Sequence, residues 1–264
     1  SSSCSKGITI FFILHHYADF TPLKKRISMV MLATLFVPVF YTYSILTDAP
    51  LLQMSASGAL DFSLGQWGLL GMTVLFQVLF SLVSVGVFSS GIDSGQVKMA
   101  VLRQCVRKQL VYAKILALFL FMALCYIVYI TFSLLCYYCF IVHSAYGTGE
   151  FISEGLRMIG VGRFAMSGIF PLFDALLTAG IVFLFSLRYK SGVCFMLAVG
   201  ITTLLLIMQF FPGIQYLVPA YVGNLLDYGE ITMPIAGVLC LLYGMIIAIC
   251  VGITARKFEG MDLK

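Results

Sequence analysis

Six long apolar stretches constrain this sequence more than any other feature. An α-helix rises about 1.5 Å per residue, so about 20 apolar residues cross the hydrocarbon core of a bilayer. The strands of a membrane barrel would instead alternate apolar and polar residues over segments of about ten. The continuous runs therefore predict an all-α membrane protein with six spanning helices, at residues 27–47, 67–89, 115–142, 165–187, 193–211 and 231–254.

The composition supports the same fold class. Hydrophobic residues make up 61% of the 264 residues and charged residues only 10%, whereas about a quarter of a soluble domain is charged. None of the segments between the apolar runs is long enough to form a soluble domain. We therefore expect one membrane domain over residues 1–264.

The basic residues indicate the orientation of the chain. If the amino-terminal side is inside, 14 of the 16 Lys and Arg residues lie in inner segments, and only Arg157 and Arg163 lie in outer loops. Short loops rich in Lys and Arg stay in the cytoplasm. We expect a multi-pass protein of the cytoplasmic membrane with both termini inside. This topology accounts for the formal charge of +5, and no feature points to nucleic acid.

Two segments outside the spans carry apolar residues of their own. Residues 1–26 contain a run at 8–14 that is too short to span, so we expect an interfacial segment at the inner leaflet. Residues 212–230 are apolar but broken around Pro219, and they predict a re-entrant or interfacial helical hairpin before the sixth span. Trp67, near an outer boundary, is expected to anchor the chain at the membrane interface.

The loop after the second span, at residues 91–114, is the most informative segment. Nothing breaks a helix between residues 96 and 114, and its apolar side chains share one face while Lys and Arg occupy the rest. The pattern predicts a short amphipathic helix at the inner membrane surface. Two interpretations stay open, namely a basic anchor that sets the topology and a contact site for a partner protein.

The order of residues in this loop is specific. Arg107 follows Gly95 by twelve residues, Lys114 follows Arg107 by seven, and Lys108 and Tyr112 lie between the last two. This spacing resembles the coupling loop in permease subunits of type-two ABC exporters, in particular the bacteriocin-immunity-like branch of low-GC bacteria. The six-span layout and the broken apolar segment before the last span are similar to that family as well.

That resemblance implies a subunit that works with other proteins. The sequence has no Gly-rich loop ending in Gly-Lys-Ser or Gly-Lys-Thr, so ATP and Mg²⁺ would be bound by a separate cytosolic ATPase and no cofactor by this chain. A second permease subunit, identical or paralogous, would complete the pair. The substrate would be amphipathic or peptide-like, as in resistance to antimicrobial peptides. The residues expected to couple to the ATPase are Gly95, Lys98, Arg103, Arg107, Lys108 and Lys114.

An enzyme is not expected, because the sequence lacks a catalytic constellation. It has three histidines, at positions 15, 16 and 143, and none lies in the middle of a span. A metalloprotease helix needs two histidines four residues apart with a Glu, and a serine hydrolase needs a Ser beside a base. A secondary transporter driven by an ion gradient stays open as an alternative, since such proteins also carry isolated intramembrane charges and broken helices.

Asp174 is the only charged side chain well inside a predicted span. A carboxylate is costly in hydrocarbon and should face the bundle interior or a wet cavity. It either lines the substrate path or lies near the outer interface, hydrogen-bonded to a neighbouring helix. Gln77 and Gln209 are assigned to the same path, although an amide within a span more often bonds to another helix.

Small residues recur along one face of the last predicted span, where they favour close packing against another helix. They are Gly237, Gly244 and Gly252.

Overall fold

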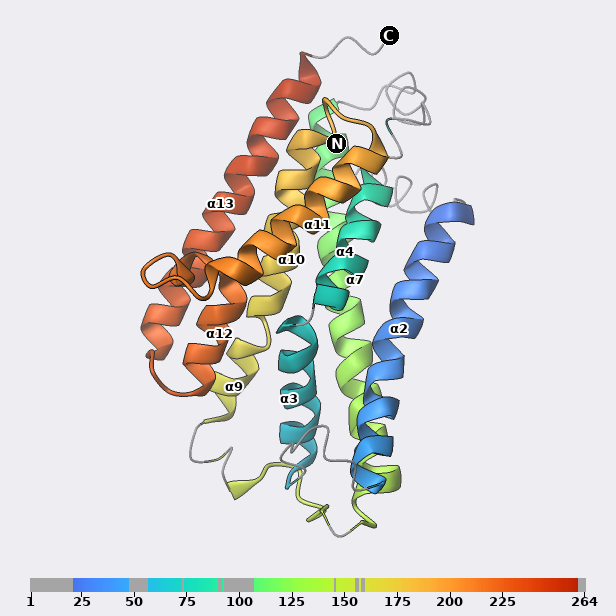
Figure 1. Cartoon of the computed structure of the whole chain (residues 1–264), viewed down its shortest axis with the longest axis vertical. Helices are drawn as coiled ribbons and strands as arrows, with labels where there is room; N and C mark the ends of the chain where they lie inside the picture. Colours follow the sequence, from blue (N-terminus) through green and yellow to red (C-terminus); the bar gives the residue numbers. More distant parts are fainter. Residues whose placement is uncertain are drawn as a thin grey trace, which may run out of the picture.

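The computed structural model of the chain describes residues 21–47, 57–72, 74–89, 92, 107–144, 146–154, 157 and 160–260. In these ranges the regular structure is helical, as predicted (Figure 1). The elements are α2 (Thr21–Leu46), α3 (Ala59–Met72), α4 (Val74–Val87), α7 (Arg107–Cys136), the π-helix η1 (Tyr137–Ile141), α9 (Val161–Ser167), α10 (Phe170–Phe185), α11 (Ser191–Met208), the 3-10 helix η2 (Gln215–Leu217), α12 (Pro219–Asp227) and α13 (Met233–Glu259).

Within the described ranges, five helical segments are long and apolar enough to cross a membrane, which supports a multi-pass membrane protein. They are Ile27–Leu46, Arg107–Ile141, Val161–Phe185, Ser191–Met208 and Met233–Glu259. Each overlaps one of the predicted spans. The segment Arg107–Ile141 begins earlier than the predicted span at 115–142. Helix α7 already includes Arg107 and continues without a break through residue 115.

The predicted second span, at residues 67–89, is not one continuous helix. Its place is taken by α3 and α4, two helices of 14 residues each, which Figure 1 shows as separate pieces along the height of the bundle. The side-chain amide of Gln77 donates a 3.3 Å hydrogen bond to the Gly71 carbonyl near the end of α3. A polar side chain thus bonds a carbonyl at a helix end, where the α-helical ladder no longer supplies partners.

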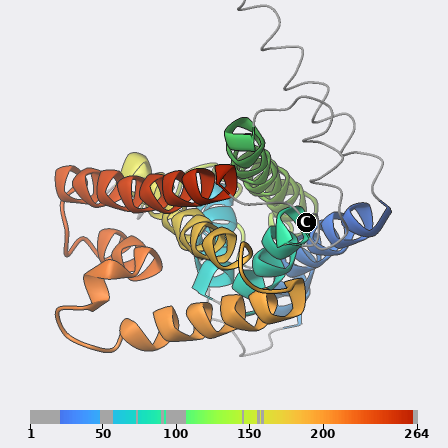
Figure 2. The ribbon, with the colours of Figure 1, turned by 90° about the horizontal axis from the view of Figure 1, so that it is seen from above.

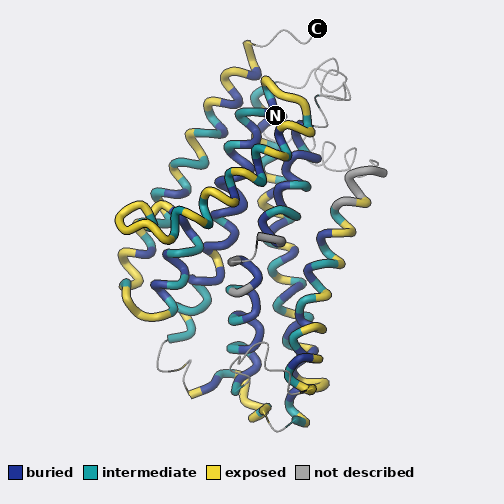
Figure 3. Tube along the Cα trace, viewed as in Figure 1, coloured by how far each residue is buried: buried dark blue, intermediate teal, exposed yellow. Residues whose placement is uncertain are grey.

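Helix α10 forms the core of the bundle. About two thirds of its segment (67%) is buried, against 17–28% for the other four. It packs against α13, α4, α12 and α11, and Figure 2 shows it between α13 and α11. Figure 3 shows exposed residues along the lengths of the outer helices. Many of these residues are apolar, for example Leu32, Met196 and Leu241. Such faces suit contact with lipid chains.

Trp67 belongs to this core, so its predicted role as an interfacial anchor is wrong. Its side chain is fully buried, and its indole N–H donates a 2.8 Å hydrogen bond to the Gly168 carbonyl. The rings of Phe76, Tyr126 and Tyr129 pack around it at centroid distances of 4.9–5.1 Å. A buried indole needs an acceptor for its N–H, and the carbonyl between α9 and α10 provides one.

Glycines make close helix contacts at positions other than those predicted. A Cβ added at Gly237, Gly244 or Gly252 would meet no described heavy atom within 4 Å, so this face does not pack closely against the described helices of this chain, and its packing against a helix of another chain stays a prediction. At Gly71 an added Cβ would lie 2.4 Å from the Pro171 Cβ, and at Gly223 it would lie 3.1 Å from the Phe170 Cβ. These two glycines allow α3 and α12 to approach α10.

The segment before α13 is helical and broken, as the sequence indicated. Helix α12 has nine residues, far fewer than a membrane span needs, and it follows the short 3-10 helix η2. It packs against α9 and α10 and buries Val222, Leu225 and Leu226. This packing holds α12 beside the core helix.

The basic residues of the described chain gather mainly at one end of the bundle. This basic end consists of Arg107 and Lys108 on α7, Arg188 and Lys190 after α10, and Arg256 and Lys257 on α13. Residues 1–20 and 93–106 lie outside the described residues. They contain most of the predicted interfacial segment and three of the predicted coupling residues, Gly95, Lys98 and Arg103.

Candidate functional site

Asp174 sits near the start of α10, one turn after Pro171, and only 5% of its surface is exposed. Its Oδ2 accepts a 3.1 Å hydrogen bond from the backbone N–H of Ala220 in the first turn of α12. The residue at the N-cap of α12 is Val218, which has no side chain to accept such a bond. Asp174 therefore caps α12 from another helix, and the positive end of the α12 dipole stabilises its carboxylate.

The three residues assigned to a substrate path line one pocket. Gln77 on α4, Asp174 on α10 and Gln209 at the end of α11 surround it, together with Thr202 and Ala220. The pocket contains about 330 Å³ of space between atoms, part of it open to the surroundings. The three side chains that were predicted to share one path come from three different helices. The pocket therefore brings two amides, a carboxyl group and a hydroxyl together between α4, α10 and α11.

Several buried oxygens at or near this pocket have no hydrogen-bond partner among the described residues. They belong to Asp174 (Oδ1), Gln77 (Oε1) and, one turn after Asp174 on α10, Thr178 (Oγ1). An unsatisfied buried polar group costs about 1–3 kcal/mol. The pocket is therefore suited to water, a proton or a donor group of a ligand. In the described ranges no three His, Cys, Asp or Glu side chains come close enough to hold a metal.

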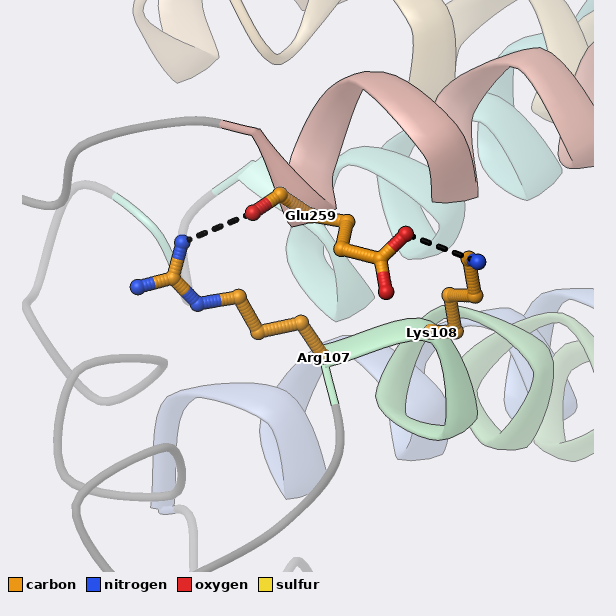
Figure 4. A network of polar contacts seen from close by, with 3 residues as sticks. All are labelled: Arg107, Lys108 and Glu259. Atoms are coloured by element: carbon orange, nitrogen blue, oxygen red, sulfur yellow. Dashed lines mark hydrogen bonds and ion pairs between the residues drawn. The ribbon is translucent and has the colours of Figure 1, made fainter.

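At the basic end, Glu259 joins α13 to the first turn of α7 (Figure 4). Its carboxylate forms a 2.7 Å ion pair with the Lys108 ammonium, and its backbone carbonyl accepts a 3.1 Å hydrogen bond from the Arg107 guanidinium. Both side chains of the ion pair are about half-exposed, where such a pair is worth only about 0–1 kcal/mol. The contact fixes geometry more than it stabilises the fold.

Lys114 differs from the other predicted coupling residues because its side chain is buried (3% exposed). Its ammonium donates a 2.8 Å hydrogen bond to the Val87 carbonyl at the end of α4 and lies 5.2 Å from the centre of the Phe88 ring. A lysine at a helix C-terminus satisfies a carbonyl and complements the helix dipole. This geometry gives Lys114 a role in holding α7 against α4.

Some residues of these sites were missed in the sequence. Ala220 contributes only a backbone N–H, for which no sequence signal exists. Thr178 is four residues after Asp174, so it lies on the same face of α10, and that spacing could have identified it. Glu259 could have been noticed as an acidic residue two positions after the basic pair Arg256 and Lys257.

Asp227 at the end of α12 gives a testable pH dependence. Burial raises its pKa to about 6, and a hydrogen bond with Ser167 partly opposes this. Because the folded-state pKa is raised, folding favours the neutral acid, so this stability is full below about pH 4 and is lost as the pH rises through about 6. Allowing for solvent screening of a partly exposed group, we expect an effect of about 1 kcal/mol, or a Tm about 2–4 °C lower at pH 7.5 than at pH 4.5.

Thermal unfolding of the purified protein across this pH range measures the effect. Asp227→Asn should remove that part of the pH dependence, and Glu230→Gln, at an exposed position nearby, should retain it. An identical pH profile in wild type and Asp227→Asn would contradict the assignment.

No protein-family model, curated protein or solved structure matches this chain.

Proposed function

We propose that the chain is the membrane-spanning subunit of an ATP-driven ABC transporter of a bacterial cytoplasmic membrane. A separate cytosolic ATPase would bind ATP and Mg²⁺, and a second permease subunit would complete the complex. The substrate class that fits is an amphipathic or peptide-like molecule, exported or extracted from the bilayer. In this proposal α3 and α4 together form the second of six spans, η2 and α12 form the outer re-entrant segment, and both termini face the cytoplasm.

The connection of α7 to its neighbours is the observation that carries the proposal. The loop with the coupling-type spacing leads directly into α7 at Arg107. Within two turns of that point α7 is tied to α13 through Glu259 and to α4 through Lys114. A force applied to the loop would therefore reach three spans at once. ATP binding that favours one closed arrangement of the ATPases would shift the spans between two access states.

A secondary transporter is the second candidate, and the pocket around Asp174 favours it. A buried carboxylate with one unpartnered oxygen, next to the break between α3 and α4, is a feature that ion-coupled transporters use. The two functions differ in their energy source. Transport by the purified chain on an ion gradient, with no ATPase present, would establish the second candidate.

Affinity purification from the native membrane tests the first candidate. We expect a cytosolic ATPase to co-purify with the chain, and Arg107→Glu together with Lys98→Glu to release it. A lost charged pair in a protein interface typically costs about 2–5 kcal/mol, which is a loss of affinity of tenfold or more.

Lys190→Glu is the matched control, because Lys190 is an exposed cation at the same end but outside the loop. All variants should insert with the same orientation, since the remaining basic residues still satisfy the topology rule. Normal ATPase binding and normal transport in the double variant would leave the loop as a basic anchor only.

A further inference from the structure

A large pocket lies between the first turns of α7 and the last turns of α13, separate from the pocket around Asp174. It contains about 780 Å³ of space between atoms and is open on one side. Lys108 and Tyr112 line it from α7, and Ile249, Gly252 and Arg256 are among the residues that line it from α13. We refer to this pocket as the α7–α13 groove.

The lining of the groove changes from apolar to basic along the helix axis. On α13, Ile249, Ile253 and Arg256 are four and three residues apart, so they share one face, and Arg256 lies about 10 Å beyond Ile249. On α7, Lys108 precedes Tyr112 by one turn. Both helices therefore place a cation at the basic end, and the apolar and aromatic side chains lie further from that end along the helix axis.

The apolar part of the groove is accessible. Tyr112 is 50% exposed, Ile249 61% and Ile253 41%. Between the two isoleucines, Gly252 leaves open space, since a Cβ added there would meet no described atom within 4 Å. The groove thus has room for a hydrocarbon chain against α13.

The charges at the basic end favour an anion. Beside the groove the cations are Arg107, Lys108, Arg256 and Lys257, and among the described residues there only Glu259 opposes them, so the formal charge of these five is +3. The Lys108 ammonium is already paired with the Glu259 carboxylate at 2.7 Å. Arg256 is exposed, and no salt bridge joins it to another residue within the described part of the chain. The guanidinium is therefore open to a ligand oxygen.

We propose that the α7–α13 groove binds an anionic phospholipid. Its phosphate lies between Lys108 and Arg256, and one acyl chain runs past Gly252 along Ile249 and Ile253. Basic residues between spanning helices at the inner surface bind such head groups, and the apolar strip below them requires a ligand with a hydrocarbon chain. A free phosphate or an acidic peptide would use only the basic half of the groove.

Native mass spectrometry of the full chain in detergent tests this, with dioleoylphosphatidylglycerol and dioleoylphosphatidylcholine as probes. We expect the chain to bind dioleoylphosphatidylglycerol in preference to dioleoylphosphatidylcholine. Arg256→Gln and Lys108→Gln should each weaken it about fivefold, the usual contribution of one cation near an anionic lipid. Glu259→Gln should strengthen it, because Lys108 is then released from its ion pair. Gly252→Leu should block the acyl chain and reduce binding without a change of charge.

Two control variants separate the groove from general attraction to a basic surface. Lys257→Gln removes an exposed charge next to Arg256 but outside the groove, and Gly244→Leu adds the same bulk to an open position two turns away on α13. Both variants should bind dioleoylphosphatidylglycerol as tightly as the wild type does. Equal weakening in Lys257→Gln and Arg256→Gln, or undiminished binding in Gly252→Leu, would overturn the proposal. It would also be overturned if Gly252→Leu abolished a dimer and left lipid binding unchanged.

Discussion

In the proposed transporter, Asp174→Asn is expected to leave the protein folded while the transport rate falls by tenfold or more. The amide oxygen of Asn can still accept the hydrogen bond from the Ala220 N–H, so the cap on α12 remains. What is lost is the ability to carry a negative charge or exchange a proton at the oxygen that has no protein partner. A buried charged contact with a ligand is typically worth about 2–5 kcal/mol, which exceeds one decade in rate.

Initial transport rates in proteoliposomes, measured beside the Tm of the same preparation, distinguish this role from capping. Thr178→Val is the companion variant, because it removes the neighbouring unpartnered hydroxyl while the contact between Asp174 and Ala220 is retained. It should reduce transport by a smaller factor. If Asp174→Asn transports at the wild-type rate with an unchanged Tm, Asp174 serves only to cap α12.

Gly71→Ala is expected to destabilise the fold by about 1–3 kcal/mol, the usual cost of one extra carbon in a packed core. The new Cβ would fall 2.4 Å from the Pro171 Cβ and 2.5 Å from its Cγ. Neither atom belongs to a flexible chain end, so α3 and α10 must separate. The Gly71 carbonyl also accepts the bond from Gln77, and the pocket around Asp174 should widen as the helices move.

The matched variant is Gly244→Ala, on a face of α13 where the new Cβ meets open space. It should leave the Tm unchanged or raise it slightly, because Ala favours the helix over Gly by up to about 1 kcal/mol. Thermal unfolding of both variants in one detergent compares them directly. Equal Tm values for Gly71→Ala and the wild type would mean that α3 and α10 are not packed at this crossing.

The sequence was sufficient to predict the helical class and the positions of most spans, because a bilayer demands long apolar runs and these can be counted. It was insufficient for the break between α3 and α4. The contacts at that break join Gly71 to Pro171 and Gln77 to Gly71, and the first of these pairs is far apart in the chain. Trp67 was misplaced for a similar reason, since its acceptor at Gly168 lies 101 residues away.

The candidate site divides in the same way. Asp174, Gln77 and Gln209 could be selected singly, because a polar side chain within an apolar run is conspicuous. Their common pocket depends on the packing of α4, α10 and α11, which periodicity does not specify. Lys114 shows the opposite problem. Its place in the loop pattern predicted a coupling residue, but no pattern in the sequence indicated that its side chain would be buried and bonded to the Val87 carbonyl.

The cap on α12 has a consequence for biosynthesis. Asp174 is synthesised before its hydrogen-bond donor, since Ala220 follows it by 46 residues. At about 5–20 residues per second, the ribosome needs roughly 2–9 seconds to supply that donor. During this interval α10 also lacks α13, one of its main packing partners. The burial of α10 is therefore completed only after α12 and α13 have been synthesised, late in assembly.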